Sequence, residues 1–271
     1  MKYFEYGKAN DELLVMLHGG GVSYRGAVPL AEYLANFYHV ILVAYDGFNP
    51  SEPDTEFKST TYEALKLGNY LVAHYDGKVD ILYGVSYGTF VLMDVLADKR
   101  LIIATTIADG MPTMDYPDIK NPILKRLFLF FFTGFAYQLI GKAGPIPIRK
   151  RIVCKMMGRS EAALDKLIYR DASWQSWYNQ DACMIGRHRD FDLFKRSDLY
   201  VWHGIKSATE RKLAKNMQEW TDKGYAFTYK IFSNMGHGSL AGEHWEQFAQ
   251  ELAMAHQETL KKRAREEKMI R

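Results

Sequence analysis

The stretch Val79-Asp80-Ile81-Leu82-Tyr83-Gly84-Val85-Ser86-Tyr87-Gly88 decides the fold of this chain. Its first half is a short apolar run, which is typical of a buried strand. The run ends in the pattern Gly-x-Ser-x-Gly, and the apolar residues 89–97 that follow predict a helix. A sharp turn from strand to helix strains its central residue, and the small glycines let strand and helix approach. The sequence therefore predicts that Ser86 stands exposed at the carboxyl edge of a sheet, above the positive end of a helix.

The composition is that of an ordinary globular protein. The chain has 271 residues, 48% of them hydrophobic and 25% charged, which is enough to bury a large core without disulfides. The net charge of +3 is small and no aromatic-basic repeat occurs, so no nucleic-acid partner is predicted. Cys154 and Cys183 have neither a CxxC nor a metal-ligand spacing, which predicts reduced thiols. With no apolar leader and no Asn-x-Ser/Thr sequon, the predicted location is cytoplasmic.

Strand-like and helix-like segments alternate along most of the chain. The predicted strands are 13–17, 39–44, 79–83, 101–108, 198–203 and 225–232, and the predicted helices are 27–37, 60–74, 89–97, 208–221 and a long one from about 242. This alternation predicts a parallel sheet with helices on both faces. Between Met111 and about Lys195 the pattern becomes helical throughout, which is too long for a simple crossover. We therefore predict a core formed by residues 1–112 and 196–271, with an inserted helical cap at 113–195.

A serine hydroxyl needs a base before it becomes a good nucleophile. His237 is the best candidate among eight histidines, because it lies in Asn234-Met235-Gly236-His237-Gly238, directly after the last predicted strand. The flanking glycines let its imidazole project over the edge of the sheet. His18 is better placed to order the glycine loop that it begins, and the role of His203, also at a strand end, stays open.

The segment His18-Gly19-Gly20-Gly21 follows the first strongly apolar strand. Glycines at this position let backbone N–H groups face a developing negative charge. We expect Gly20, with Gly19 close by, to supply one oxyanion donor and the Tyr87 N–H the other. A phosphate-binding loop is excluded, because neither Gly-x-x-x-x-Gly-Lys-Ser/Thr nor Gly-x-Gly-x-x-Gly occurs here.

Together, the glycine loop, the Gly-x-Ser-x-Gly turn and Gly236-His237 resemble the α/β-hydrolase family, in residues and in chain order. The resemblance covers roughly residues 1–112 and 196–271. It implies an eight-stranded, mostly parallel sheet with a variable helical cap. It also implies a Ser–acid–His triad in that chain order and hydrolysis of an ester or a related acyl bond. The chemistry needs no metal or organic cofactor, and no HExxH pattern occurs.

The acid of the triad is where the sequence departs from the family. The usual position follows the strand that here ends at Gly204, but Ser207 stands there and Glu210 lies one helical turn further on. The alternative is Asp109, which ends the strand after the nucleophile strand and precedes Gly110. We favour Asp109 and keep Glu210 as the second candidate. Either carboxylate would fix the histidine tautomer and stabilise the imidazolium.

The predicted cap is basic and apolar. Residues 119–160 contain nine Lys or Arg and no Asp or Glu, and the apolar run 127–140 spans about 14 residues, short of the roughly 20 needed to cross a membrane. Three interpretations stay open: a cap helix packed on the core, an acyl pocket beneath a basic rim, and transient docking on an anionic membrane surface. Trp174, Trp177 and Tyr178 are candidates to line such a pocket.

The sequence thus predicts a serine hydrolase that cleaves a carboxylic ester, or a related acyl bond, of a small apolar or anionic substrate. Amide, thioester or carbon–carbon hydrolysis, or acyl transfer, would use the same triad, and the fold does not separate them. A catalytically silent ligand-binding protein is a third hypothesis, favoured by Ser207 alone. Asp46 is expected to cap a loop.

Overall fold

The computed structural model describes residues 1–110, 117–141, 147–185, 187, 191–207, 211, 214–215, 217, 219, 221–222, 225 and 227–270. Its centre is a seven-stranded sheet with the strand order β1-β3-β2-β4-β5-β6-β7. Neighbouring strands are parallel except β1, which runs antiparallel to β3. The strands are β1 (Lys2–Tyr6), β2 (Leu13–Leu17), β3 (His39–Ala44), β4 (Lys78–Val85), β5 (Ile102–Asp109), β6 (Asp198–Gly204) and β7 (Thr228–Phe232).

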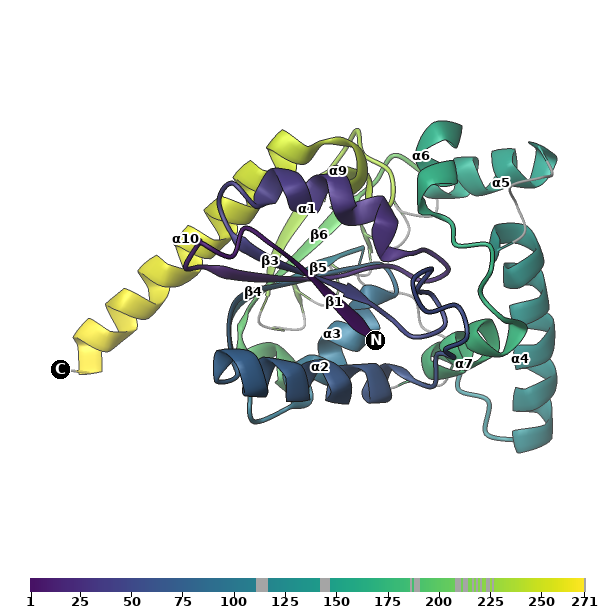
Figure 1. Cartoon of the computed structure of the whole chain (residues 1–271), viewed down its shortest axis with the longest axis horizontal. Helices are drawn as coiled ribbons and strands as arrows, with labels where there is room; N and C mark the ends of the chain where they lie inside the picture. Colours follow the sequence, from purple (N-terminus) through teal and green to yellow (C-terminus); the bar gives the residue numbers. More distant parts are fainter. Residues whose placement is uncertain are drawn as a thin grey trace.

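Helices cover both faces of this sheet (Figure 1). On one side lie α1 (Val28–Leu34), α9 (Ser239–Glu243) and α10 (Trp245–Ile270), and on the other lie α2 (Thr60–Tyr75) and α3 (Gly88–Ala97). Between β5 and β6 come α4 (Pro122–Ala136), α5 (Pro147–Met157), α6 (Glu161–Leu167) and α7 (Trp174–Met184). Short helical turns are η1 (Tyr24–Ala27), η2 (Tyr137–Gly141) and η3 (Phe191–Arg196).

The predicted fold class, a mostly parallel sheet between two helical layers, is confirmed. The predicted number of eight strands is wrong for the described residues, which form seven. No strand was expected at β1, because its residues do not form an apolar run. As an edge strand, β1 stays exposed or half-buried along its whole length, so its sequence lacks the signal of a buried strand.

The inner strands explain the apolar runs in the sequence. Every residue of β2 is buried, and so is every residue of β3 after His39. One apolar cluster packs beneath α2 and α3, and a second packs beneath α1 and α10. Because the strands from β2 onward are parallel, their carboxyl ends meet at one edge of the sheet, and α4–α7 lie beyond that edge (Figure 1).

Backbone hydrogen bonds attach the inserted helices to this edge. The Ser23 N–H donates to the Leu167 carbonyl at 3.2 Å, and the Tyr169 N–H donates to the Gly21 carbonyl at 3.0 Å. The described part of 113–195 is helical apart from connecting turns and an isolated bridge between Val22 and Ile168. These helices therefore rest directly on the loop that follows β2.

Candidate active site

Ser86 lies at the turn between β4 and α3 with a φ angle of +54°. This left-handed conformation is unfavourable for a residue with a Cβ atom. The flanking glycines are required by space: a Cβ on Gly84 would lie 2.9 Å from the Gly88 carbonyl oxygen, and one on Gly88 would lie 2.6 Å from that of Leu17. The Ser86 N–H donates to the Asp109 carbonyl at 2.8 Å, which ties the turn to β5.

His237 lies in the loop after β7, facing the same cavities as Ser86. Its backbone N–H donates to the Met157 carbonyl at 2.7 Å, so the end of α5 holds the loop in place. The Gly236 N–H donates to Ser239 Oγ at 2.9 Å and fixes the turn into α9. His203, by contrast, is completely buried inside β6. The position of His237 is therefore set by the core and the inserted helices together.

Asp109 ends β5 and is only 2% exposed. Its carboxylate accepts a hydrogen bond from the Tyr83 hydroxyl at 2.8 Å. The next residue, Gly110, has a φ angle of +64°, and a Cβ there would lie 2.7 Å from Cε1 and 2.9 Å from Nδ1 of His237, against 3.7 Å from Nε2. The Nδ1–Cε1 edge of the imidazole thus faces Gly110, the residue that follows Asp109.

The second acid candidate, Glu210, lies outside the described residues. Ser207, at the position where the family usually has its acid, is buried at 8% exposure. The neighbouring Lys206 N–H donates to the Met235 carbonyl at 2.9 Å, so this loop runs beside the histidine loop.

The glycine loop after β2 borders the serine. A Cβ on Gly19 would lie 3.3 Å from Ser86 Cβ and 3.8 Å from Oγ, so this backbone passes close to the hydroxyl. Gly20 and Tyr87 line the larger of two cavities together with Ser86 and His237. Ser86, His237, Gly20 and Tyr87 thus line the larger cavity, and Gly19 lines the smaller one with Ser86, His237 and Gly20.

Helix α7 packs on this loop through two residues that the sequence did not assign to it. The Gly21 N–H donates to Gln180 Oε1 at 3.2 Å, and a Cβ on Gly20 would lie 2.7 Å from Gln180 Nε2. A Cβ on Gly21, where φ is +65°, would lie 2.4 Å from Trp177 Cη2. Gly20 and Gly21 therefore lie in close contact with α7, and Gly21 also needs its positive φ angle.

His18 helps to fix the conformation of the glycine loop. Its Nδ1 lies 2.9 Å from the Gly19 carbonyl oxygen, and its Nε2 accepts a hydrogen bond from the Tyr45 N–H at 3.4 Å. Burial lowers the pKa of His18 to about 4, so the ring is neutral at physiological pH. A neutral ring with Nδ1–H donating satisfies both contacts.

Two mostly apolar cavities meet at Ser86 and His237. The smaller, of about 90 Å³, lies beside the glycine loop and includes Leu30 and Arg159. The larger, of about 390 Å³, lies under the inserted helices and is lined chiefly by apolar residues, Phe132, Phe135, Leu139, Ile140, Trp177 and Met184 among them. Of the three aromatic residues predicted to line the pocket, Trp177 is the one found among the described lining residues. Trp174 instead packs on Phe130 and Tyr137.

Arg159 is the basic side chain that reaches the site. It follows α5, its side chain is 6% exposed, and its Nε lies 3.1 Å from Glu243 Oε1 in α9. The guanidinium also packs on Gly242, where a Cβ would force it to shift. Arg159 therefore joins the inserted helices to the segment that follows His237.

Asp181 of α7 is a buried carboxyl group that the sequence did not single out. It is 2% exposed and lines the larger cavity, and its Oδ2 accepts no hydrogen bond from a described residue. Burial raises the pKa of Asp181 to about 7, an effect that the nearby Thr133 hydroxyl opposes. The group can therefore change its charge near neutral pH.

Asp181→Asn is expected to change how stability depends on pH. The pKa of Asp181 is raised from 3.8 to about 7 in the folded chain, so wild-type stability falls as pH rises through this window. The unfolding free energy of the variant minus that of wild type should therefore increase by on the order of 4 kcal/mol from about pH 4 to pH 8. Urea unfolding at both pH values measures the difference, with the exposed Asp171→Asn as control. A difference that does not vary with pH would contradict the burial of a charge at this position.

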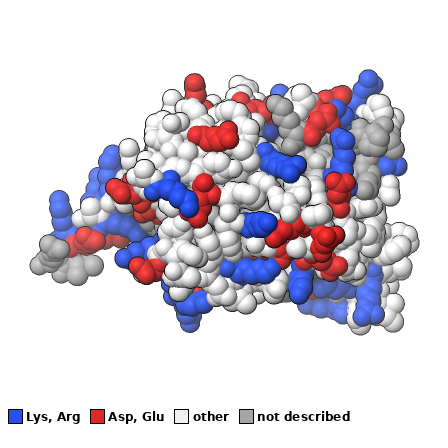
Figure 2. All heavy atoms as spheres, viewed as in Figure 1, with Lys and Arg blue, Asp and Glu red and all other residues white. Residues whose placement is uncertain are grey.

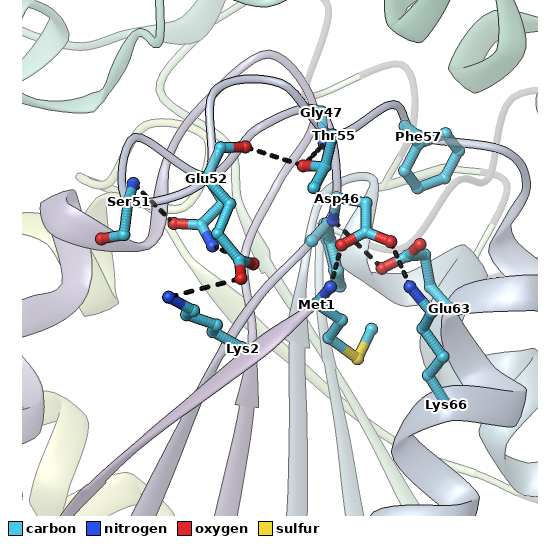
Figure 3. A network of polar contacts seen from close by, with 12 residues as sticks. Met1, Lys2, Asp46, Gly47, Ser51, Glu52, Thr55, Phe57, Glu63 and Lys66 are labelled. Carbon is cyan, nitrogen blue, oxygen red and sulfur yellow. Dashed lines mark hydrogen bonds and ion pairs between the residues drawn. The ribbon is translucent and has the colours of Figure 1, made fainter.

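Asp46, near the carboxyl end of β3, belongs to a separate polar network (Figure 3). Its carboxylate contacts the Met1 amino group and the Lys66 ammonium, and its backbone N–H donates to Glu63 Oε2 at 3.3 Å. Burial raises the pKa of Glu63 to about 7. Asp46 thus anchors its loop to β1 and α2, a structural role.

Comparison with known proteins agrees with this fold. The model of the alpha/beta hydrolase family matches residues 14–251, so the chain belongs to this family, which implies a hydrolase. No curated protein matches the chain.

Solved structures show the same architecture at low identity. An alpha/beta hydrolase family protein from Desulfitobacterium hafniense superposes with a TM-score of 0.70 and 18% identity, over 93% of this chain and 99% of that one. MenH from S. aureus gives 0.65 and 17%, over 96% and 98%. A thermophilic esterase from Thermogutta terrifontis gives 0.64 and 16%, over 95% and 93%. At these identities the likeness establishes the fold alone.

Proposed function

We propose that this chain is a serine hydrolase that cleaves a carboxylic ester through an acyl-enzyme. The proposal rests on one observation. Ser86 has a φ angle of +54° at the turn, and Ser86 and His237 line the same two cavities. A strained serine at the edge of a parallel sheet, beside a histidine, is the arrangement that nucleophilic catalysis requires.

In this mechanism Ser86 Oγ attacks the acyl carbonyl while His237 Nε2 accepts the hydroxyl proton. Asp109, which precedes the glycine that faces the Nδ1 edge of the ring, fixes the tautomer and stabilises the imidazolium. The N–H groups of Gly20 and Tyr87 stabilise the oxyanion, with the positive end of α3 beneath it. When the intermediate collapses, His237 returns the proton to the leaving alcohol. Water then attacks the acyl-enzyme by the same route and releases the acid.

The cavities suggest an apolar substrate. At about 390 Å³ the larger cavity falls within the usual range for small-molecule sites, and its walls are mostly apolar. We assign the acyl chain to this cavity and the smaller alcohol to the one of about 90 Å³. The charge of Arg159 at the smaller cavity is balanced by Glu243, which favours an uncharged ester over an anionic one.

A fluorophosphonate probe combined with a chromogenic ester series tests the proposal. We expect one equivalent of probe per chain, attached to the peptide that contains Ser86, and ester hydrolysis with an optimum acyl length set by the larger cavity. Amides and thioesters of equal acyl length separate the ester preference from its alternatives. Neither labelling nor turnover of any of these substrates, with retained ligand binding, would instead favour the catalytically silent hypothesis.

A further inference from the structure

The outer side of α4 is apolar and open to solvent. Six large hydrophobic residues of this helix are between 52% and 75% exposed: Ile123, Leu124, Leu127, Phe130, Phe131 and Phe135. Their spacing of three and four residues places them along one side of the helix, which we name the outer cap face. A surface helix of a soluble protein normally turns its polar side outward, so an exposed apolar stripe of this size marks an interaction surface.

The inner side of the same helix is already occupied. Leu129 and Thr133 are buried, and α4 packs against α7. Phe132 and Phe135 line the larger cavity. The outer cap face is thus additional to the contacts that hold the helix on the protein.

Basic residues lie at the start of this helix and on α5, which packs against η2. Lys125 and Arg126 lie near the start of α4, and Arg151 and Lys155 lie on α5, and none of these four forms an ion pair within the described part of the chain. Figure 2 shows Lys and Arg side chains gathered at the lower right of the molecule, where α4 begins in Figure 1. An apolar face with basic residues close to its helix is complementary to a membrane surface, which has an apolar interior and anionic head groups.

We propose that the outer cap face docks this protein on an anionic membrane surface, with α4 lying along the interface. The hydrophobic side chains would enter the acyl region while the basic residues contact lipid head groups. This inference goes beyond the proposed hydrolase activity and does not depend on it.

The helix that contains the apolar run is longer than the run itself. The continuous helical segment Pro122–Gly141 has 20 residues and a mean hydropathy of 1.4, so by length and composition it could cross a bilayer, unlike the run of about 14 residues counted from the sequence. The apolar run begins at Leu127, whereas the helix begins at Pro122 and includes Lys125 and Arg126. These charges and the packing on α7 favour a helix that lies on the surface over one that spans the membrane.

The docking face also adjoins the site. Phe135 is 65% exposed on the outside and lines the larger cavity on the inside. A docked protein would therefore hold the wall of its acyl cavity against the lipid phase, from which a hydrophobic ester could enter without crossing water.

Co-sedimentation with vesicles tests the proposal. The full-length chain should bind vesicles of phosphatidylcholine mixed with phosphatidylglycerol, bind those of phosphatidylcholine alone much less, and be released by salt. Two double variants, Leu127→Gln/Phe131→Gln and Lys125→Gln/Arg126→Gln, should each lower the partition coefficient by roughly tenfold or more. The matched control is Phe37→Gln/Leu65→Gln, which replaces residues 55% and 53% exposed on the core and should bind as wild type does.

Circular dichroism and thermal unfolding verify that the variants fold. If a variant fails to fold, the dependence of wild-type binding on lipid charge and salt decides whether the protein docks on anionic membranes. Unchanged binding by both face variants, or no binding to anionic vesicles, overturns the proposal. So does a dimer in solution that the Leu127→Gln/Phe131→Gln variant abolishes, because the face would then serve a second copy. Binding that resists alkaline carbonate and salt would indicate a spanning helix instead.

Discussion

Ser86→Ala should lower kcat for ester hydrolysis by about 10⁵-fold and abolish fluorophosphonate labelling. Without Oγ no acyl-enzyme forms, and the remaining groups would only orient water and polarise the carbonyl. The chemistry lost is that of a hydroxyl placed at the turn between β4 and α3, where Gly84 and Gly88 let the neighbouring backbone segments approach closely. Initial rates on a soluble ester, compared with the uncatalysed reaction, measure the effect.

The stability of the Ser86 variants to urea provides the control for this prediction. Ser86 has a φ angle of +54°, which costs a residue with a Cβ on the order of 1 kcal/mol and costs glycine little. Ser86→Gly is therefore expected to be inactive yet about 1 kcal/mol more stable to urea, whereas Ser86→Ala keeps the strain. Inactive variants of normal or higher stability would show that activity, and not folding, depends on the serine. Substantial turnover by Ser86→Ala would overturn the serine mechanism.

The core was predictable because its signals are local. The apolar runs of β2 and β3 and the glycines around Ser86 arise from burial and close approach within a few residues. The edge strand β1 was missed, since an edge strand needs no continuous apolar run. The expectation of eight strands came from family resemblance and not from the residues themselves.

The contribution of the inserted helices to the site was not predictable. Gln180 bonds to the Gly21 N–H across 159 residues of chain, and no sequence pattern links the two. No sequence pattern indicates that Asp181 and Arg159 are buried at the site either, because their burial depends on how α4–α7 pack on the sheet edge. Trp177 was a candidate to line the pocket, together with Trp174 and Tyr178.

The choice of acid depended on topology in the same way. Asp109 and Glu210 both follow predicted strands, and a sequence does not show which strand end lies beside the histidine. The pairing of β4 with β5 places Val85 opposite Asp109, one residue from Ser86, and Gly110 against the His237 ring. This is why we propose Asp109 as the acid.

Asp109→Asn is accordingly expected to lower kcat by about 10³- to 10⁴-fold, because a neutral amide can hold the wrong imidazole tautomer and leaves the imidazolium without its counter-charge. Tyr83→Phe removes the 2.8 Å hydrogen bond to the same carboxylate but keeps its charge, so a loss of roughly tenfold is expected. Glu210→Gln is the decisive control and should stay within about threefold of wild type, since in this mechanism it bears no charge that His237 needs. Rates on one soluble ester from about pH 5 to pH 9 compare the three variants. A severe loss in Glu210→Gln with near-normal rates in Asp109→Asn would transfer the acid role to the strand end after β6, where the family usually has it.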